Sequence, residues 1–412
     1  MKSVQKIQSI LIIGGGLGGL ALAQGLMAAG LNVTVFERDK DPASRSQGYR
    51  ISIRSMGLSA LKALLPPDLF NQLSAARVKD MGAGFCYATD QLRLLFKAPE
   101  GKDYAVQMLR SKLREILLTG LNVEWNKRLT SILKVGNQIE AQFEDGAKFT
   151  GDLLIGCDGS HSTVREILRK NFSHTPKSVP EVIDSGIVII GGHIERTADW
   201  DNALPLNRFG PVRFLGPNGH ALFVSFSERE DRRPTIMWAF SQYMEKPNAS
   251  NQELITHCVQ IMEKENWHPV LVKLVRSTHP HELIEPWVVR TTRFGEMSRW
   301  PIDPSGQITL LGDAVHAMPP DRGIGGNNVF EDARLLTSLL AAVKYDSNLP
   351  QLIGEYEQSL FTRAKKAVKA SEKAAKIHHL KSDWRICIRN LALKLMGTMI
   401  TLVTSFTGHQ QK

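Results

Sequence analysis

The chain opens with an apolar and polar pattern that predicts a strand, a turn, a helix and a second strand. Residues 10–13 form a continuous apolar run, which is typical of a strand buried on both faces of a parallel sheet. A glycine-rich stretch follows, and residues 20–29, rich in alanine and leucine, predict a helix that ends at Gly30. Residues 31–36, Leu-Asn-Val-Thr-Val-Phe, predict a second strand. This order predicts a βαβ unit with parallel strands.

The glycines of this unit have the spacing Gly14-x-Gly16-x-x-Gly19. The first permits a tight turn, the second lets the backbone approach a pyrophosphate, and the third lets the helix pack close to the strand. Glu37 ends the second strand, where its carboxylate can accept hydrogen bonds from both hydroxyls of an adenosine ribose. The unit predicts a dinucleotide site but does not distinguish NAD from FAD.

Two further strand-to-helix turns follow along the chain. Residues 151–165 contain a short apolar strand, the pair Asp158-Gly159 and Ser162 as the cap of a helix. Residues 308–328 contain a strand, the pair Gly312-Asp313, a proline-rich loop and a glycine loop, and a helix is expected over 331–343. The glycine loop places backbone amides at a helix N-terminus, which suits an electron-rich ring edge. Asp313 is placed to accept a hydrogen bond from a polyol hydroxyl.

The pattern changes between residues 171 and 286, where segments 186–194, 221–227 and 235–243 predict strands of an antiparallel sheet. In the last segment Ile236, Trp238 and Phe240 share one face, and Met237, Ala239, Ser241 and Tyr243 share the other. We expect Trp238 and Phe240 to lie in the core. The polar candidates near a substrate are His193, Arg213 and Tyr243, although each is also compatible with an ordinary surface or core-edge position.

Taken together, the three motifs resemble the class A flavoprotein monooxygenases, the family with the para-hydroxybenzoate hydroxylase fold, over about residues 9–370. The resemblance implies an α/β fold, with a Rossmann-like FAD-binding domain around a parallel sheet, an antiparallel-sheet substrate domain and C-terminal helices. The expected boundaries are 1–80, 105–170 and 287–365 for the FAD-binding domain, 81–104 and 171–286 for the substrate domain, and 366–412 for a C-terminal helical segment.

The resemblance also implies which residues bind FAD. Gly14, Gly16, Gly19 and Glu37 would hold its ADP half, and Asp313 would bind the ribityl chain. The segment 47–53 looks like the one that passes the flavin in the tetracycline-modifying and fungal secondary-metabolite branch. The full expected set is Gly14, Gly16, Gly19, Glu37, Arg38, Gly48, Arg50, Arg110, Asp158, Gly159, Gly312, Asp313, Pro320, Gly323, Gly325, Gly326 and Asn327.

The activity implied by the resemblance is that of an FAD-dependent monooxygenase. NADH or NADPH would reduce the flavin as a transient partner, and O₂ would form a flavin C4a-hydroperoxide. That species would deliver one oxygen atom to a small aromatic, alkaloid or polyketide-like substrate. The flavin carries the chemistry in such enzymes, so we assign no catalytic residue. Two alternatives stay open at this point: an FAD-dependent dehydrogenase or reductase of the same fold, and a non-catalytic flavin-binding or basic interaction protein.

Composition and charge narrow the classes of partner that the protein is expected to bind. The 412 residues are 42% hydrophobic, which argues against disorder, and the net charge is +10. Such a charge is compatible with nucleic acid, an anionic membrane or a small anionic ligand. The basic stretch 363–379 lacks interleaved aromatic residues, so we expect a solvated helix and no nucleic acid. Arg50, Arg110 and Arg322 would serve reduced flavin and the nicotinamide phosphates, in a monomer or homodimer.

Cysteine spacing and the C-terminal segment complete the expectations. The four cysteines lie far apart, which argues against a disulfide framework or a thiolate metal site and favours a reducing, cytoplasmic location. The pair His378-His379 lacks a ligand partner at metal-site spacing, so no metal is expected. Residues 395–406 are apolar but too short to span a bilayer. They predict a packing helix or, less favoured, a monotopic membrane contact preceded by Arg385, Arg389 and Lys394.

Overall fold

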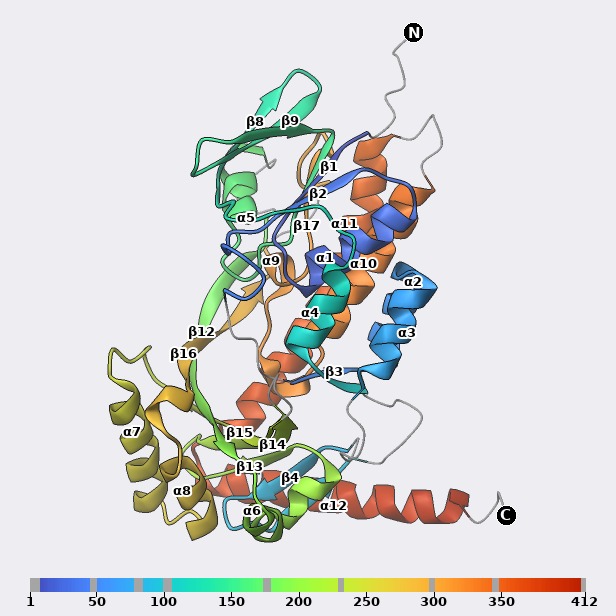
Figure 1. Cartoon of the computed structure of the whole chain (residues 1–412). Coiled ribbons are helices and arrows are strands. Elements are labelled where there is room, and N and C mark those ends of the chain that lie inside the picture. The colour runs from blue at the N-terminus through green and yellow to red at the C-terminus, as the bar shows by residue number, and fades with distance from the viewer. Residues whose placement is uncertain are drawn as a thin grey trace.

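The structure is a computed structural model of the whole chain (Figure 1). It describes residues 8–44, 50–77, 84–98, 106–172, 179–228, 233–295, 301–342 and 348–408, with backbone alone over 401–408. Gly48, one of the expected FAD-binding residues, lies outside the described residues. Two sheets organise the two halves of the molecule, and the long helix α11 (Leu349–His378) runs between them (Figure 1).

The first half contains a parallel sheet that confirms the predicted βαβ unit. Its strand order is β17 (Ile308–Leu310), β11 (Leu153–Gly156), β1 (Ile10–Ile13), β2 (Val33–Phe36) and β7 (Val123–Glu124). Every neighbouring pair is parallel. All four residues of β1 are buried, which explains its unbroken apolar run.

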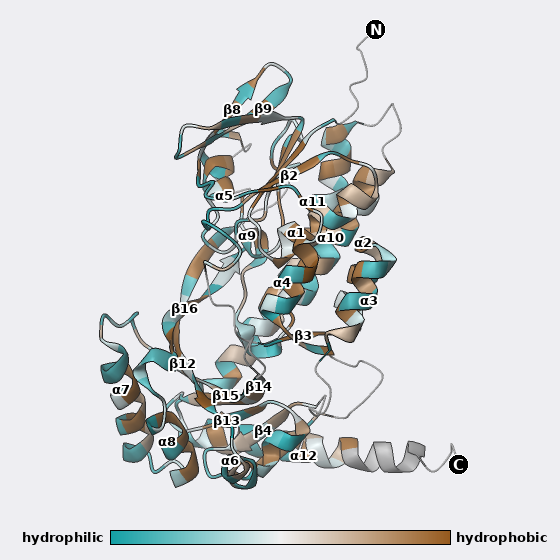
Figure 2. Ribbon diagram, in the orientation of Figure 1, coloured by the Kyte–Doolittle hydropathy of each residue, from teal (hydrophilic) through white to brown (hydrophobic). Residues whose placement is uncertain are grey.

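Helices and a second small sheet cover this parallel sheet. One layer contains α1 (Leu17–Ala28), α2 (Ser55–Leu64), α4 (Arg110–Leu118) and α10 (Gly325–Ala341) (Figure 1). The other side is covered by the antiparallel strands β8 (Leu129–Val135), β9 (Gln138–Phe143) and β10 (Lys148–Gly151). The Phe36 and Phe143 rings stack there with centroids 4.8 Å apart. Figure 2 shows hydrophobic residues concentrated on the central strands and on the helix faces turned toward them.

The second half is built on a seven-stranded sheet. Its order is β16 (Leu283–Arg293), β12 (Glu181–Glu195), β15 (Pro234–Tyr243), β14 (Ala221–Glu228), β13 (Val212–Leu215), β4 (Cys86–Thr89) and β5 (Leu94–Lys97). The pairs are antiparallel except for β13 with β4. The α/β fold with an antiparallel second sheet and C-terminal helices is therefore confirmed. The exact domain boundaries stay a prediction.

The two faces of this sheet have different neighbours. Trp238 and Phe240 are fully buried in a core shared with α7 (Asn251–Lys264) and α8 (Pro269–Arg276), as expected. On the opposite face, Ile189 and Ala239 pack against Ala375 of α11. Met237 and Ala239 therefore lie on the sheet face that turns toward α11.

Two helices begin earlier than the sequence predicts. Helix α10 starts at Gly325 rather than at 331, because the glycine loop itself forms the first turn, with the Asn328 amide donating to the Ile324 carbonyl over 3.1 Å. Helix α11 starts at Leu349, so the basic stretch is the second half of a longer helix. Its lysines are exposed, and its alanines pack inward.

Shorter elements complete the fold. Strands β3 (Arg50–Ile53) and β6 (Val106–Leu109) form an antiparallel pair between the two halves. The remaining short helices are α3 (Pro67–Ala75), α5 (Thr163–Ile167), α6 (Ala198–Ala203), α9 (Asp313–His316) and the turns η1 (Leu168–Phe172), η3 (Pro205–Phe209), η4 (Pro280–Glu282) and η5 (Pro320–Arg322). The last helix, α12 (Asp383–Gly408), lies along the edge strand β5. Across the described parts of the chain, no helix is long and apolar enough to cross a membrane.

Candidate functional site

The three motif turns meet at one edge of the parallel sheet. The Gly14 amide donates to the Phe36 carbonyl over 2.8 Å, and the Cys157 amide donates to the Ile13 carbonyl over 2.7 Å. The Leu311 amide donates to the Gly156 carbonyl over 2.9 Å. The turns therefore follow adjacent strands at their carboxyl ends, where open α/β sheets bind ligands.

The first turn has the geometry expected of each glycine. Gly14 has a φ of +113°, and a Cβ there would lie 2.4 Å from the Cys157 carbonyl oxygen. A Cβ on Gly19 would lie 2.1 Å from the Gly14 carbonyl oxygen, so only glycine allows α1 to approach the strand this closely. A Cβ on Gly16, in contrast, would meet nothing within 4 Å. Open space therefore lies at the N-terminus of α1, which fits a pyrophosphate.

Glu37 lies beside this turn. Its buried carboxylate accepts hydrogen bonds from the Gly15 amide over 2.7 Å and from the Asp39 amide over 3.0 Å. These two bonds fix its orientation and leave lone pairs on both oxygens for hydroxyl donors. The neighbouring Arg38 is exposed. The pKa of His161 is lowered mainly by burial, and the positive charges of Arg290 and Arg38 lower it further. Arg38 thus approaches the second motif.

The second motif presents an acceptor without a partner. Asp158 accepts the amides of Thr163 and Val164 through Oδ2, over 2.7 and 3.1 Å, and so caps α5. Its Oδ1 is buried and has no hydrogen-bond partner, while burial raises the pKa of the carboxyl group. Gly159 has a φ of +80°. A buried acceptor of this kind fits a hydroxyl or water brought by a bound cofactor.

The third motif presents Asp313 at the start of α9. Its side chain is exposed to solvent, and desolvation by the surrounding protein raises its pKa. The charges of His316 and Arg110 oppose this shift, which places Arg110 near Asp313. Arg50 pairs with Leu109 in the β3–β6 register and so lies beside Arg110. Arg110 therefore connects Asp313 with the end of the β3–β6 pair, where Arg50 lies.

The loop after β17 is held by Asn327. Its side chain accepts from the Arg54 amide over 2.7 Å and donates to the carbonyls of Ser52 and Gly323 over 3.0 and 3.2 Å. Gly323 has a φ of +60°, and a Cβ on Gly326 would lie 2.9 Å from the Ile51 side chain. Pro320 begins η5, and a Cβ on Gly325 would meet only Met318. Asn327 therefore fixes the glycine loop against β3.

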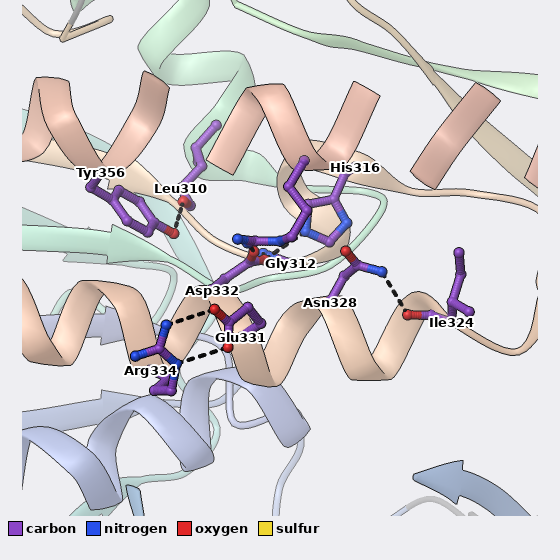
Figure 3. A network of polar contacts seen from close by, with 10 residues as sticks. Leu310, Gly312, His316, Ile324, Asn328, Glu331, Asp332, Arg334 and Tyr356 are labelled. Atoms are coloured by element: carbon purple, nitrogen blue, oxygen red, sulfur yellow. Dashed lines mark hydrogen bonds and ion pairs between the residues drawn. The ribbon is translucent and has the colours of Figure 1, made fainter. Parts of the chain in front are cut away.

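A buried network that the sequence did not reveal lies behind this loop. Asp332 of α10 accepts from the Gly312 amide over 3.2 Å, contacts His316 Nε2 at 2.6 Å and pairs with Arg363 of α11. Figure 3 shows Asp332 directed at His316 and at the Gly312 backbone. The Tyr356 hydroxyl donates to the Leu310 carbonyl over 3.1 Å in the same region. This network fixes the turn at Gly312-Asp313, which we call the Gly-Asp turn. Its sequence signal is an acid in the first turns of the helix that follows a glycine loop.

A second buried cluster joins the loop to the seven-stranded sheet. Asp321 of η5 lies 3.2 Å from Arg213 Nη1 on β13 and 2.6 Å from His378 Nδ1 at the end of α11. The Tyr87 hydroxyl lies 3.0 Å from His378 Nε2. The charge of Arg213 and the bond from His378 outweigh burial and lower the pKa of Asp321 to about 2. The structure therefore brings Arg213 to the loop.

The other two polar candidates do not join this cluster. Tyr243 is exposed, with its ring edge-on to His379. His193 lines a separate pocket of about 230 Å³ with His279 and Glu282. A groove of about 1040 Å³ lies on the other side of the loop, between α2, the start of α10 and α11. We call it the α11 groove; it is lined by Met56, Arg322, Ile324, Asn328, Glu355, Gln358, Ser359, Thr362, Arg363, Lys366, Ala367 and Ala370.

Comparison with known proteins shows which family the chain belongs to. The sequence model of the FAD binding domain family matches residues 8–371, which is most of the chain. The chain belongs to this family. Its geometry agrees, since open space at the N-terminus of α1, an unpaired buried acceptor on Asp158 and an exposed carboxylate on Asp313 suit FAD.

Relatives extend the match over nearly the whole length. A protein of Arthroderma benhamiae named "Probable FAD-dependent monooxygenase" is 30% identical over 415 residues, covering 91% of this chain and 92% of its own. FAD-dependent monooxygenase cctM of Talaromyces islandicus is 29% identical, covering 89% of this chain and 91% of its own. Klebsiella pneumoniae HpxO, solved with FAD and uric acid, has the same fold, with a TM-score of 0.74 at 20% identity over 94% of this chain and 92% of its own. The chain is an FAD-dependent monooxygenase, and FAD is its cofactor.

Proposed function

We propose that this monooxygenase is reduced by NADH or NADPH and inserts one oxygen atom of O₂ into a small organic substrate of the aromatic, alkaloid or polyketide type. The observation that carries the proposal is the contact between the glycine loop and the sheet, where Arg213 meets Asp321 at 3.2 Å. This contact joins the motif that would lie beside the flavin ring to the sheet face that would roof a substrate. The fungal relatives named as FAD-dependent monooxygenases support the same reaction class.

The sequence motifs and their geometry support specific roles toward FAD. Gly14, Gly16 and Gly19 would admit the pyrophosphate, and Glu37 would accept the ribose hydroxyls. Asp313 would accept from the ribityl chain, with Arg110 and Arg50 providing positive charge near the ring. Gly312, Gly323, Gly325 and Gly326 would bring backbone close to the ring, with Pro320 and Asn327 fixing the loop. Bound FAD supplies the transfer of electrons from the nicotinamide to O₂ and of one oxygen atom onward.

The protein's own contribution to the reaction would be placement and exclusion of water. Phe223 and Met237 are half-buried on the sheet face that turns toward α11, and Met318 lies in the loop below. Apolar and aromatic walls of this kind suit a flat organic substrate. No side chain here needs to act as a general base, because an electron-rich substrate requires only correct placement against the flavin. Arg213 and Asp321 add a fixed ion pair beside this space.

The α11 groove is our candidate for docking the nicotinamide dinucleotide. It borders Ile324 of the glycine loop and carries Arg322 and Lys366, with apolar patches from Met56 and Ala370. Cations suit the phosphates, and a volume of about 1040 Å³ is large enough for a cofactor of this size. A transient partner needs no second glycine-rich fold of its own.

One experiment tests the FAD site. Asp313→Ala should weaken FAD binding about tenfold or more, because a hydrogen bond to a charged acceptor contributes about 1.5–3 kcal/mol. The matched control is Asp201→Ala, which removes an acid from an exposed pair with Arg196 in the other half. FAD affinity is measured by titrating the apoprotein and following flavin fluorescence. Equal affinities of the two variants would contradict the assigned role.

A second experiment tests the reductant site. Lys366→Glu reverses a charge in the α11 groove, whereas Lys369→Glu reverses an exposed charge on the same helix outside it. The first should raise KM for the reduced nicotinamide about tenfold with kcat nearly unchanged, since uniform binding is lost. The second should leave both constants unchanged. Identical effects of the two variants would exclude the groove as the docking site.

A third experiment identifies the substrate class. A panel of aromatic, alkaloid and polyketide compounds is screened for those that accelerate oxidation of NADH or NADPH by the FAD-loaded protein. A monooxygenase consumes O₂ with formation of an oxygenated product. Substrate conversion without O₂ uptake would point instead to a dehydrogenase of the same fold, and a complete lack of stimulation by any compound would favour a non-catalytic role.

A further inference from the structure

Helix α12 has one face fixed to the protein. Leu393 packs with Leu95 of β5 in a small apolar cluster. A Cβ on Gly397 would lie 3.3 Å from the Leu95 carbonyl oxygen, so the helix runs close against the edge strand. The Arg389 side chain is buried and donates to the carbonyls of Ile377 and His378 over 3.4 and 3.3 Å. This face anchors α12, and Arg389 belongs to it rather than to an outer surface.

The opposite face of α12 is apolar and open. Trp384, Ile388, Leu391, Leu395 and Met399 are 60%, 58%, 59%, 56% and 67% exposed. With 3.6 residues per turn, these five side chains fall within about 80° of arc. They form one continuous stripe along the described side chains of the helix, which we call the outer stripe. Single exposed hydrophobic residues are common on protein surfaces, whereas a contiguous apolar stripe marks an interaction site.

Positive charges border the outer stripe on both sides. Lys394 lies about 60° beyond Leu391, and Arg385 lies about 40° beyond Met399 on the other side. Both side chains are exposed. No acidic residue follows Asp383 in the sequence. An apolar stripe with a cation on each side resembles helices that lie in the interface of a bilayer, where long basic side chains reach the headgroups.

The charge pattern also separates lipid from the other occupant of such a stripe. A second copy of this chain would bring the same cations against each other across the paired helices, with no acid on α12 after Asp383 to neutralise them. An anionic lipid surface instead complements them. The helix lies along one edge of the molecule and continues past its body toward the C-terminus (Figure 1).

We propose that α12 docks this protein on the surface of an anionic lipid bilayer, lying in the plane of the interface with its outer stripe among the acyl chains. Docking of this kind does not require a helix that spans the bilayer, and none of the described helices could do so. Part of the net charge of +10 would then serve membrane attraction. The proposal does not depend on which substrate the enzyme oxidises or on how it is reduced.

The test is co-sedimentation of the FAD-loaded full chain with vesicles. One set contains phosphatidylcholine alone, and the other contains phosphatidylcholine with phosphatidylglycerol. We expect the protein to bind the anionic vesicles and added salt to weaken this binding. Arg385→Gln and Lys394→Gln should each lower the affinity for these vesicles about fivefold. The double variant Leu391→Glu with Leu395→Glu should lose binding by about tenfold or more, because it puts charge into the apolar layer.

The matched control is Leu133→Glu on β8, which changes an exposed leucine of 46% exposure far from α12. It should bind vesicles as the wild type does. FAD content, measured in every variant, shows that the substituted chains are folded. Failure of the wild type to bind anionic vesicles at low salt would overturn the proposal. A second result would also overturn it: sedimentation velocity shows a wild-type dimer that the double variant no longer forms, while the double variant still binds vesicles as the wild type does. The stripe would then join two copies of the chain.

Discussion

Two buried aspartates, Asp332 and Asp321, each bind a histidine and an arginine, yet the two clusters treat their histidines in opposite ways. Asp332 holds His316 and Arg363 within the FAD-binding half. Asp321 holds His378 and Arg213 where that half meets the second sheet. Burial alone would lower the pKa of both histidines. The Asp332 and Asp313 carboxylates nevertheless raise the pKa of His316 above its ordinary value.

His378 lacks that second carboxylate. Burial lowers its pKa to about 4, and the charges of Arg213 and His379 support this shift against the attraction of Asp321. In the first cluster two acids face one histidine, whereas in the second one acid is shared by an arginine and two histidines. Both clusters contain an aspartate, a histidine and an arginine, yet the pKa of the histidine shifts in opposite directions. The direction of the shift therefore depends on the other charges near the histidine and not on these three residue types alone.

The largest effect should come from Asp332→Asn. Asp332 is fully buried, and asparagine there removes the negative charge and replaces one of the two acceptor oxygens, which serve Arg363, His316 and the Gly312 amide, by a donor. Breaking a buried ion pair in this way costs about 3–5 kcal/mol. Urea unfolding of the FAD-loaded protein measures this loss, and FAD content should fall with it.

The neighbouring Glu331 supplies the control for Asp332. Glu331 pairs with Arg334 on the partly exposed side of the same helix. Because such pairs contribute about 0–1 kcal/mol, Glu331→Gln should change the unfolding midpoint little. Similar losses for the two substitutions would show that the buried network does not stabilise the Gly-Asp turn.

A somewhat smaller effect is expected from Asp321→Asn. It leaves Arg213 and His378 without the shared carboxylate, at a cost of about 3 kcal/mol. Because this cluster joins the loop to the sheet rather than supporting the Gly-Asp turn, FAD affinity should change less than in Asp332→Asn. Unfolding curves and FAD titrations compare the two variants. An FAD loss equal to that of Asp332→Asn would erase the distinction drawn between the clusters.

The pH dependence of stability should differ in sign between the clusters. The folded pKa of His378 is lowered to about 4, so its stabilising contribution is complete above about pH 6.5 and is lost as the pH falls toward 4. The folded pKa of His316 is raised, so its contribution is complete below about pH 6.5 and is lost as the pH rises through the folded value. His378→Gln should therefore reduce the loss of unfolding free energy as the pH falls below about 6.5. His316→Gln should reduce the loss of unfolding free energy as the pH rises above about 6.5. Urea midpoints from pH 5 to pH 8 test this, and losses unchanged by either substitution would refute it.

Within the two clusters, the smallest effect should come from Tyr87→Phe. It removes one hydrogen bond at the edge of the Asp321 cluster, between the Tyr87 hydroxyl and His378 Nε2, and leaves the ring in place. A neutral hydrogen bond contributes about 0.5–1.5 kcal/mol, so unfolding should shift by that amount. A loss as large as that of Asp321→Asn would mean that the hydroxyl, and not the carboxylate, holds the cluster together.

The sequence predicted the parts of the molecule that depend on local patterns. The apolar run of β1, the spacing of Gly14, Gly16 and Gly19, and the alternation around Trp238 each specify a structure within a few residues. Both aspartate clusters escaped prediction because their members come from separate elements. Asp321 and His378 lie 57 positions apart, and only the length of α11 brings them together.

The ends of helices were also hard to predict. Glycine has a low helix propensity, so the sequence placed the start of α10 after the glycine loop. In the structure Asn327 holds that loop against β3, and the helix begins at Gly325. Only the less favoured membrane-contact alternative placed Arg389 on a basic side with Arg385 and Lys394; in the structure its side chain donates instead to the carbonyls at the end of α11. In each case a contact with a distant element outweighed the local preference.

The most direct measurement for the whole account follows the oxygen atom. A substrate found in the panel is converted by the FAD-loaded protein under isotopically labelled O₂, with NADH or NADPH as reductant, and the product is examined by mass spectrometry. We predict one labelled oxygen atom in each product molecule and one reduced nicotinamide consumed for each product formed. An unlabelled product, or one formed without O₂, would contradict monooxygenation.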